Sequence, residues 1–257
     1  MLAAVAATCA SPARAQVSFT LSADSDYRVR GISLSDGKPD LSLSLAYDHS
    51  SGLYAGASLL ADENLQGGAR MLGALAYAGY STRITDGLAW DIGAEYAHIS
   101  DQASYRIQLP APDPPVYPAT GLAGSSYVLN IQRRYDGDYS EVYAGLVGGG
   151  ASVRLSYSPD YLDEHVQTLY LDLSGSVRPA PRWRLFGHVG ALTPVGGSGQ
   201  PMVESGYERY DLRAGAAFEL KDCELRLVWT SVRPSFDYPF LLRQRKDALV
   251  FGASYFF

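Results

Sequence analysis

The chain has 257 residues, of which 21 are basic and 27 acidic, so its formal net charge is −6. This acidity argues against nucleic acid as a partner, and the absence of any run of about 20 apolar residues excludes a helical membrane span. The chain is instead rich in Tyr (19 residues) and Gly (26 residues), a composition that favours strands and tight turns over helices.

The first residues, MLAAVAATCASPARAQ, resemble a secretory signal peptide. A short apolar stretch is followed by Ala13-Arg14-Ala15, an A-x-A cleavage pattern that ends before Gln16. We therefore expect residues 1–15 to be removed and residues 16–257 to form one domain. Removal also takes away Cys9 and leaves Cys223 alone, so the exported chain has no internal disulfide.

After residue 16 apolar and polar residues alternate with a period of two, which is typical of strands with two unlike faces. In SFTLSADSDYRVR, for example, Phe19 and Leu21 alternate with Thr20 and Ser22. The segment 125–134 (SYVLNIQRRY) also resembles a strand. Because a thirteenth strand would invert the order of the later connections, we place it inside a long loop, as a local hairpin. The alternation predicts twelve strands, near 17–30, 39–48, 53–61, 70–80, 88–99, 139–147, 151–158, 166–177, 182–192, 207–219, 224–233 and 247–257.

Every second connection between these strands is short. Short examples are HSSG (49–52), GGG (148–150), RPAP (178–181) and LKDC (220–223), whereas the others are mostly longer and one covers 100–138. Short turns at one end and long loops at the other are typical of an outer-membrane barrel, with periplasmic turns and extracellular loops. The predicted fold is therefore all-β: a single transmembrane antiparallel up-and-down β-barrel of about twelve strands, with 100–138 as a long extracellular loop.

The last residues, DALVFGASYFF, keep the alternation up to Phe257. A membrane barrel must pair its last strand with its first, because unpaired backbone groups in hydrocarbon are costly. The ending also resembles the terminal strand that barrel-assembly machinery recognises, with Gly252, Tyr255 and Phe257 as its spaced glycine and aromatic residues. Val250 departs from that pattern, since a polar residue usually stands two positions before the glycine.

The stretch SDYRVRGISLSDGKPDLSLSLAYDHSSGLYAGASL (25–59) resembles the opening of a proteobacterial family, the TorF-like porins. That opening reads S-D-Y-R-x-R-G-x-S-x-S-D-G-x-P, followed by a strand and H-x-S-G-x-Y-x-G. EVYAGL (141–146) and YSPDYL (157–162) resemble later segments of the family, whereas 100–138 departs from it. The resemblance implies an outer-membrane barrel with a porin-like role. The matching residues are Ser25, Asp26, Tyr27, Arg28, Arg30, Gly31, Ser33, Ser35, Asp36, Gly37, Pro39, His49, Ser51, Gly52, Tyr54 and Gly56.

If the apolar face meets lipid, the polar face lines a lumen with charges of both signs. Two readings stay open: the charges form a field that orients and filters polar solutes, or acids and bases pair across strands and fill the lumen. Twelve strands lie between filled eight-strand barrels and open sixteen-strand porins, so any channel is narrow. We expect Asp26, Arg28 and Arg30 near the outer end of the first strand, in a constriction or in a network that anchors the next loop. The predicted lumen or constriction residues are Asp24, Asp26, Arg28, Arg30, Asp91, Glu95, Arg154, Asp172, Arg209, Asp211, Arg213 and Arg226.

The sequence thus predicts a porin-like channel for passive diffusion of small polar solutes, exported through the periplasm to a Gram-negative outer membrane. Its expected partners are outer-membrane lipid and lipopolysaccharide, the barrel-assembly machinery and the solutes; no cofactor or metal site is predicted. Two alternatives remain, a lipid-acting hydrolase at the membrane rim and a closed structural or adhesive barrel. His98, on the lipid side near the outer rim, is the candidate for the hydrolase. No G-x-S-x-G nucleophile motif accompanies it, so we predict no enzyme.

Overall fold

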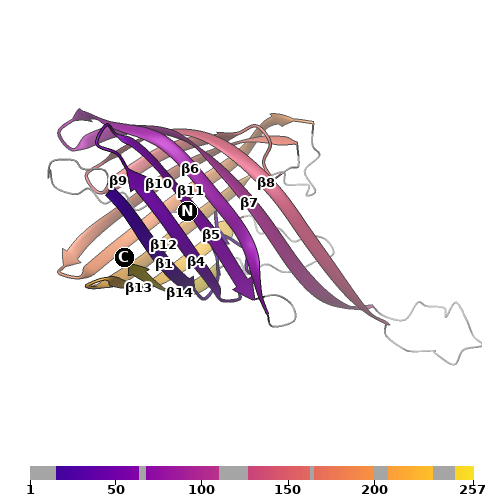
Figure 1. The fold of residues 1–257 in the computed structure, drawn as a ribbon. Coiled ribbons are helices and arrows are strands. Elements are labelled where there is room, and N and C mark those ends of the chain that lie inside the picture. The colour runs from indigo at the N-terminus through magenta and orange to yellow at the C-terminus, as the bar shows by residue number, and fades with distance from the viewer. Residues whose placement is uncertain (1–15, 64–67, 110–126, 163–164, 199–207, 234–246) are drawn as a thin grey trace, which may run out of the picture.

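The computed structural model describes residues 16–63, 68–109, 127–162, 165–198, 208–233 and 247–257, with the backbone alone over 101–109 and 127–136. Within these ranges twelve strands form one closed antiparallel barrel, and a two-stranded hairpin is separate from it (Figure 1). None of the described residues forms a helix that is long and apolar enough to cross a membrane.

The barrel closes through its first and last strands. Their ladder runs from Thr20 opposite Phe256 to Asp24 opposite Gly252, and every other barrel strand pairs with its neighbours in chain order. The predicted twelve-stranded antiparallel barrel is confirmed. The barrel strands are β1 (Gln16–Asp24), β4 (Asp40–Asp48), β5 (Leu53–Glu63), β6 (Ala69–Thr85), β7 (Leu88–Leu109), β8 (Tyr127–Gly148), β9 (Ala151–Ser158), β10 (Val166–Ala180), β11 (Trp183–Gly197), β12 (Arg209–Leu220), β13 (Cys223–Arg233) and β14 (Asp247–Phe256); the hairpin consists of β2 (Arg28–Val29) and β3 (Ile32–Ser33).

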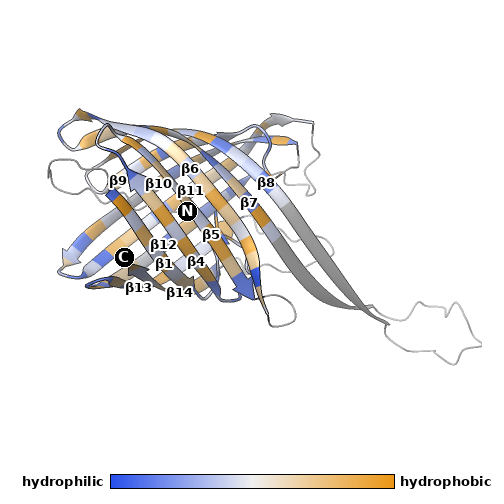
Figure 2. Cartoon of the chain, viewed as in Figure 1, coloured by the Kyte–Doolittle hydropathy of each residue, from blue (hydrophilic) through white to orange (hydrophobic). Residues whose placement is uncertain are grey.

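Large apolar side chains cover the outside of the barrel. Phe19, Leu43 and Leu249 are 46%, 48% and 65% exposed, whereas Ser254, on the inward row of β14, is 5% exposed. Figure 2 shows hydrophobic and hydrophilic residues alternating along the strands in the same way. A closed barrel with a continuous apolar exterior suits hydrocarbon rather than water, as expected of a transmembrane barrel.

Two-residue turns and the four-residue 49–52 turn gather at one end of the barrel, which we call the short-turn end. They lie at 49–52, 86–87, 149–150, 181–182 and 221–222. In one of them Gly149 and Gly150 both have positive φ (60° and 80°), as a type I′ hairpin turn requires. The connections at the opposite end, the long-loop end, are longer, as the sequence predicts.

Strands β7 and β8 extend beyond their neighbours at the long-loop end (Figure 1). They pair without interruption from Leu88 opposite Gly148 to Leu109 opposite Tyr127, whereas β6 follows β7 only as far as Ile99. The predicted 100–138 loop is therefore wrong at both ends. The predicted separate hairpin at 125–134 is also wrong, because residues 127–134 begin β8 and run directly into the predicted strand 139–147. Because residues 127–148 form one strand, the barrel still has twelve strands. Residues 110–126 and the predicted signal peptide, 1–15, lie outside the described residues.

Candidate functional site: the lumen and its inner loop

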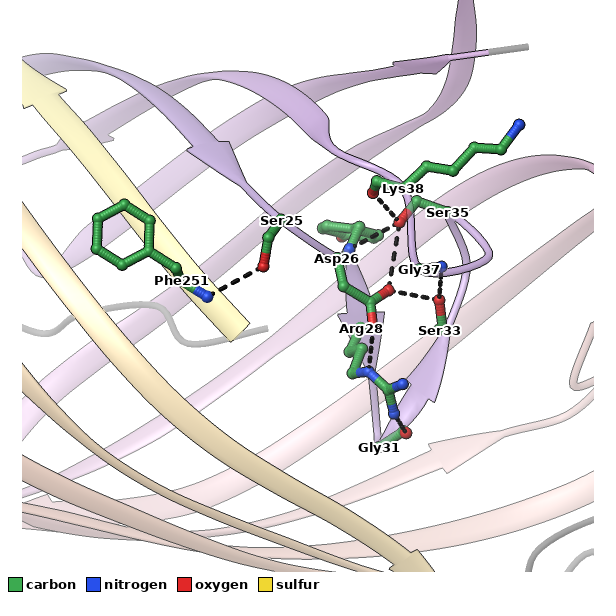
Figure 3. Close-up of polar contacts among 10 residues, drawn as sticks. Ser25, Asp26, Arg28, Gly31, Ser33, Ser35, Gly37, Lys38 and Phe251 are labelled. Carbon is green, nitrogen blue, oxygen red and sulfur yellow. Dashed lines mark hydrogen bonds and ion pairs between the residues drawn. The ribbon is translucent and has the colours of Figure 1, made fainter. Parts of the chain in front are cut away.

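Between β1 and β4 the chain turns into the barrel, and we call residues 25–39 the inner loop. The turn begins at Ser25, whose amide donates to the Phe251 carbonyl (2.9 Å) and whose hydroxyl accepts from the Phe251 amide (3.0 Å) (Figure 3). The β2–β3 hairpin follows, with Arg30 and Gly31 at its tip at φ 49° and 79°. Two consecutive positive φ values are those of a type I′ turn. The first strand thus ends at Asp24, and its predicted extension to residue 30 is wrong.

The tip of this hairpin rests on the inner wall of the barrel. A Cβ added to Gly31 would lie 2.7 Å from Cβ of Val232 on β13 and 3.1 Å from Cβ of Asp211 on β12. Only a glycine fits such an approach at this φ. The inner loop is therefore packed inside the barrel.

The carboxylate of Asp26 organises the inner loop. It accepts hydrogen bonds from Arg28 Nε (2.5 Å) and Ser33 Oγ (2.5 Å), and Ser35 Oγ lies 3.3 Å away (Figure 3). Arg28 also donates through Nη1 to the Gly31 carbonyl (2.9 Å), which ties the carboxylate to the hairpin tip. Charge-assisted bonds of this kind are among the stronger ones in proteins, so the loop has a defined shape of its own.

Arg30 connects the inner loop to the wall on the β8–β10 side. Its Nη2 donates to both carboxylate oxygens of Glu141 on β8, at 2.7 and 2.6 Å. The guanidinium carbon also lies 4.0 Å from the ring centroid of Tyr170 on β10 and 5.4 Å from that of Tyr161, within the range of a cation–π interaction. Both charged side chains are about nine-tenths buried. The inner loop therefore spans the lumen and obstructs it.

A second network lies on β10, β11 and β12. His188 approaches Asp211 Oδ1 through Nε2 (2.8 Å) and Asp172 Oδ2 through Nδ1 (3.0 Å). Tyr170 donates to Asp211 Oδ2 (3.0 Å), and Ser174 donates to Asp172 Oδ1 (2.9 Å). Ser174 Oγ also lies 3.1 Å from His188 Nδ1, so this nitrogen faces both Asp172 and Ser174. The network joins Tyr170, Ser174 and His188 to two inward carboxylates across three neighbouring strands.

Two further clusters pair the inward charges closer to the short-turn end and at the seam. Arg154 donates to Asp91 Oδ2 (2.8 Å) and stacks over Tyr143, with 4.2 Å between the guanidinium carbon and the ring centroid. At the seam Arg226 holds Asp24 through Nε (3.1 Å) and Nη2 (2.6 Å). The acids and bases of the lumen are thus largely paired across strands, as in the second reading of the sequence.

The inward carboxylate of Asp40 has no such pairing with any other described residue. Asp40 lies directly between Asp24 and Asp62 in the strand register. It is 5% exposed, and neither of its carboxylate oxygens has a hydrogen-bond partner. Its two neighbours are paired: Asp24 with Arg226 (2.6 Å) and Asp62 with Arg70 (2.7 Å). Asp40 is therefore a buried carboxyl group held beside two others without a cation of its own.

A cavity of about 60 Å³ lies beside the inner loop. Leu34, Leu75 and Ile99 are among its apolar lining residues, and Glu95 and Arg213 are among its charged ones. This volume accommodates only a few water molecules. It leaves no room for a large solute beside the inner loop in this conformation.

All twelve predicted lumen residues face the barrel interior, but three of them lie on the inner loop and not on the first strand. The inner-loop residues are Asp26, Arg28 and Arg30; the wall residues are Asp24, Asp91, Glu95, Arg154, Asp172, Arg209, Asp211, Arg213 and Arg226. Their role in a constriction stays a prediction. Sequence reasoning does not single out Glu141, the partner of Arg30, although it alternates with Val142 and shares the inward face of Tyr139 and Tyr143.

The candidate hydrolase residue lies on the outside of the barrel. His98 Nδ1 is 2.5 Å from Asp138 Oδ1, and both side chains are about 44% and 43% exposed. Among the described residues no serine hydroxyl is hydrogen-bonded to His98. The pair therefore has a base and an orienting acid, but no nucleophile.

The predicted assembly residues occupy the closing strand. Gly252 faces inward and leaves room for the Asp24–Arg226 pair, which a Cβ at this position would overlap. Tyr255 and Phe257 face outward with 4.7 Å between their ring centroids. Recognition by assembly machinery stays a prediction.

A family model described as "Bacterial protein of unknown function (Gcw_chp)" matches residues 6–104, a stretch that includes the whole inner loop. No curated protein matches the sequence.

Solved structures that resemble this one are barrels. The NanC porin structure superposes with a TM-score of 0.55 and 6% identity, covering 94% of this chain and all of that one. The KdgM porin gives a TM-score of 0.48 and 10% identity, covering 93% and 98% of the two chains. LpxR from Salmonella typhimurium gives 0.45 and 12%, covering 94% and 99%. We base the comparison on NanC, and it establishes the fold alone.

Proposed function

We propose that this protein is an outer-membrane channel for passive diffusion of small polar solutes, with a lumen that the inner loop narrows. The observation that carries the proposal is a closed barrel with an apolar exterior and charged side chains of both signs on its inner wall. Such a wall gives a permeating solute polar partners in place of lost hydration water.

The inner loop sets the size limit of this channel. Twelve strands enclose a lumen narrower than that of the large porins, and the Arg30–Glu141 bridge crosses it with both side chains largely buried. Solutes therefore pass beside the inner loop, and only small ones fit.

The resemblance of residues 25–59 to TorF-like porins supports the same function, and so does the fold shared with NanC. Export through the periplasm, contact with lipopolysaccharide and insertion by the barrel-assembly machinery are parts of this proposal. An apolar barrel exterior, which has no stable place in water, supports them.

Purified protein in planar lipid bilayers tests the proposal. We expect small, regular conductance steps, and larger steps from a variant in which residues 26–38 are replaced by a short Gly-Ser linker. If neither protein gives steps, the channel function is wrong. If only the linker variant conducts, the inner loop seals the lumen and the closed structural barrel replaces the channel.

The rim hydrolase is not proposed, because His98 lacks a nucleophile among the described residues. A lipid-hydrolysing activity that His98→Ala abolishes would reverse this conclusion.

A further inference from the structure

Most charged side chains around the cavity are neutralised by a neighbour. Arg30 is paired with Glu141, Arg154 with Asp91, and His188 with two aspartates. A permeating solute therefore meets little net charge from these groups. The charges that act on it most strongly are those held in no direct ion pair.

Two cavity-lining residues, Glu95 and Arg213, form no direct ion pair within the described parts of the chain, although Arg30 acts on Glu95 and Arg213 on Asp211 from a longer distance. Arg213 forms neither an ion pair nor a hydrogen bond there; its cross-strand neighbours are His188 and Thr230. The Glu95 carboxylate accepts one hydrogen bond, from the Tyr139 hydroxyl (3.2 Å), and has no basic side chain bonded to it. Both line the same cavity, together with Tyr27.

Glu95 and Arg213 lie on nearly opposite parts of the barrel wall, and Tyr27 of the inner loop lines the cavity with them. Glu95 is on β7 and Arg213 on β12, with four barrel strands between them on one side and six on the other. Glu95 is seven residues from Leu88, the first residue of β7, and Arg213 is seven residues from Leu220, the last of β12. Since both strands reach the short-turn end there, the two charges lie at about the same height.

We propose that Glu95 and Arg213 are the selectivity filter of the channel, and that they favour small dipolar solutes carrying both an ammonium and a carboxylate group. The inference rests on the proposed function. Opposite charges at one height produce a field across the lumen, and a zwitterion aligned in that field is attracted at both ends. A solute with one charge is attracted by one wall and repelled by the other.

Liposome swelling tests the filter with three small solutes: L-serine as the zwitterion, erythritol as the neutral solute and sodium lactate as the anion. Glu95→Gln and Arg213→Gln should each lower the rate for L-serine relative to erythritol by about threefold. Glu95→Gln should also raise the rate for lactate, and Arg213→Gln should lower it. Matched controls are Glu219→Gln and Arg178→Gln, an exposed pair at the short-turn end (3.0 Å) that should change none of these ratios.

An unchanged ratio of L-serine to erythritol in both single variants overturns the filter and leaves the channel standing. A wild-type protein that admits none of the three solutes overturns both. Heat-modifiable migration in gels confirms that each variant is folded, so that a lost rate is not a lost barrel.

Discussion

Arg30 and Glu141 are 111 positions apart in the sequence, yet Nη2 of Arg30 contacts both carboxylate oxygens of Glu141, at 2.7 and 2.6 Å. Glu141→Gln leaves the buried guanidinium without its counterion. Removing one partner of a buried ion pair usually costs about 3–5 kcal/mol, and we expect the free energy of unfolding to fall by that amount. Urea unfolding in lipid vesicles measures it. The double variant Arg30→Met/Glu141→Leu should lose less, since neither charge is left alone; equal losses would contradict the assignment.

Gly31→Ala should destabilise the protein more than Gly37→Ala. Both glycines have positive φ, 79° and 72°, so both variants carry the backbone cost of about 1–2 kcal/mol. Only at Gly31 does the new methyl group meet the wall, whereas no atom lies within 4 Å of it at Gly37. We expect Gly31→Ala to cost about 1 kcal/mol more, because overpacking displaces the hairpin tip. Similar unfolding midpoints for the two variants would show that the tip does not touch Val232.

Asp40→Asn should stabilise the barrel at mildly alkaline pH. It removes a buried carboxylate that has no hydrogen-bond partner and lies between two others. We expect the free energy of unfolding to rise by about 1 kcal/mol. Asp62→Asn is the matched control: it takes the counterion from Arg70 and should lower stability. A loss in both variants would mean that Asp40 has a stabilising partner.

Deleting Phe257 should reduce the amount of assembled barrel more than the conductance of each channel. Tyr255 pairs with Leu21 and Cys223, and the Phe257 amide donates to the Phe19 carbonyl (3.1 Å), so the last residues hold the seam. Phe257→Tyr keeps the ring and should assemble normally. Outer-membrane fractionation gives the first quantity and single-channel recording the second. Normal amounts of the deleted protein would contradict an assembly role.

Cys223 should react with a membrane-impermeant thiol reagent only after the outer membrane is opened. It begins β13 directly after the 221–222 turn, at the short-turn end that we place in the periplasm. The variant Cys223→Ser/Asp36→Cys moves the thiol to an exposed position on the inner loop and should react in intact cells. Labelling of Cys223 in intact cells would reverse the orientation of the barrel.

The alternation of side chains predicts the barrel strands because it reports a local property, the two unlike faces of each strand. It fails at residues 25–30 for the same reason. Asp26, Arg28 and Arg30 continue the alternation of β1, but the hydrogen bonds that turn the chain inward come from Ser33 and Ser35 further along. The S-D-G turn at 35–37 lies near the end of the inner loop and not at its beginning.

Pairing between distant strands is also hidden from the sequence. The inward face of 139–147 is readable, but nothing local connects Glu141 with Arg30. In the same way, the period of two continues through 100–109 and 127–138, and only the ladder between β7 and β8 shows that these residues are strand. The lumen residues are therefore predictable as a set, and their partners are not.

The bonds between Ser25 and Phe251 have a consequence for the order of folding. The inner loop starts at the residue that also joins the first strand to the last, and its contacts with the distant wall include Glu141, Asp211 and Val232. None of these partners is in place until nearly the whole chain has formed its strands and closed into a barrel. The inner loop is thus the first loop to be synthesised and among the last to fold. Its docking against the wall indicates that the barrel has closed.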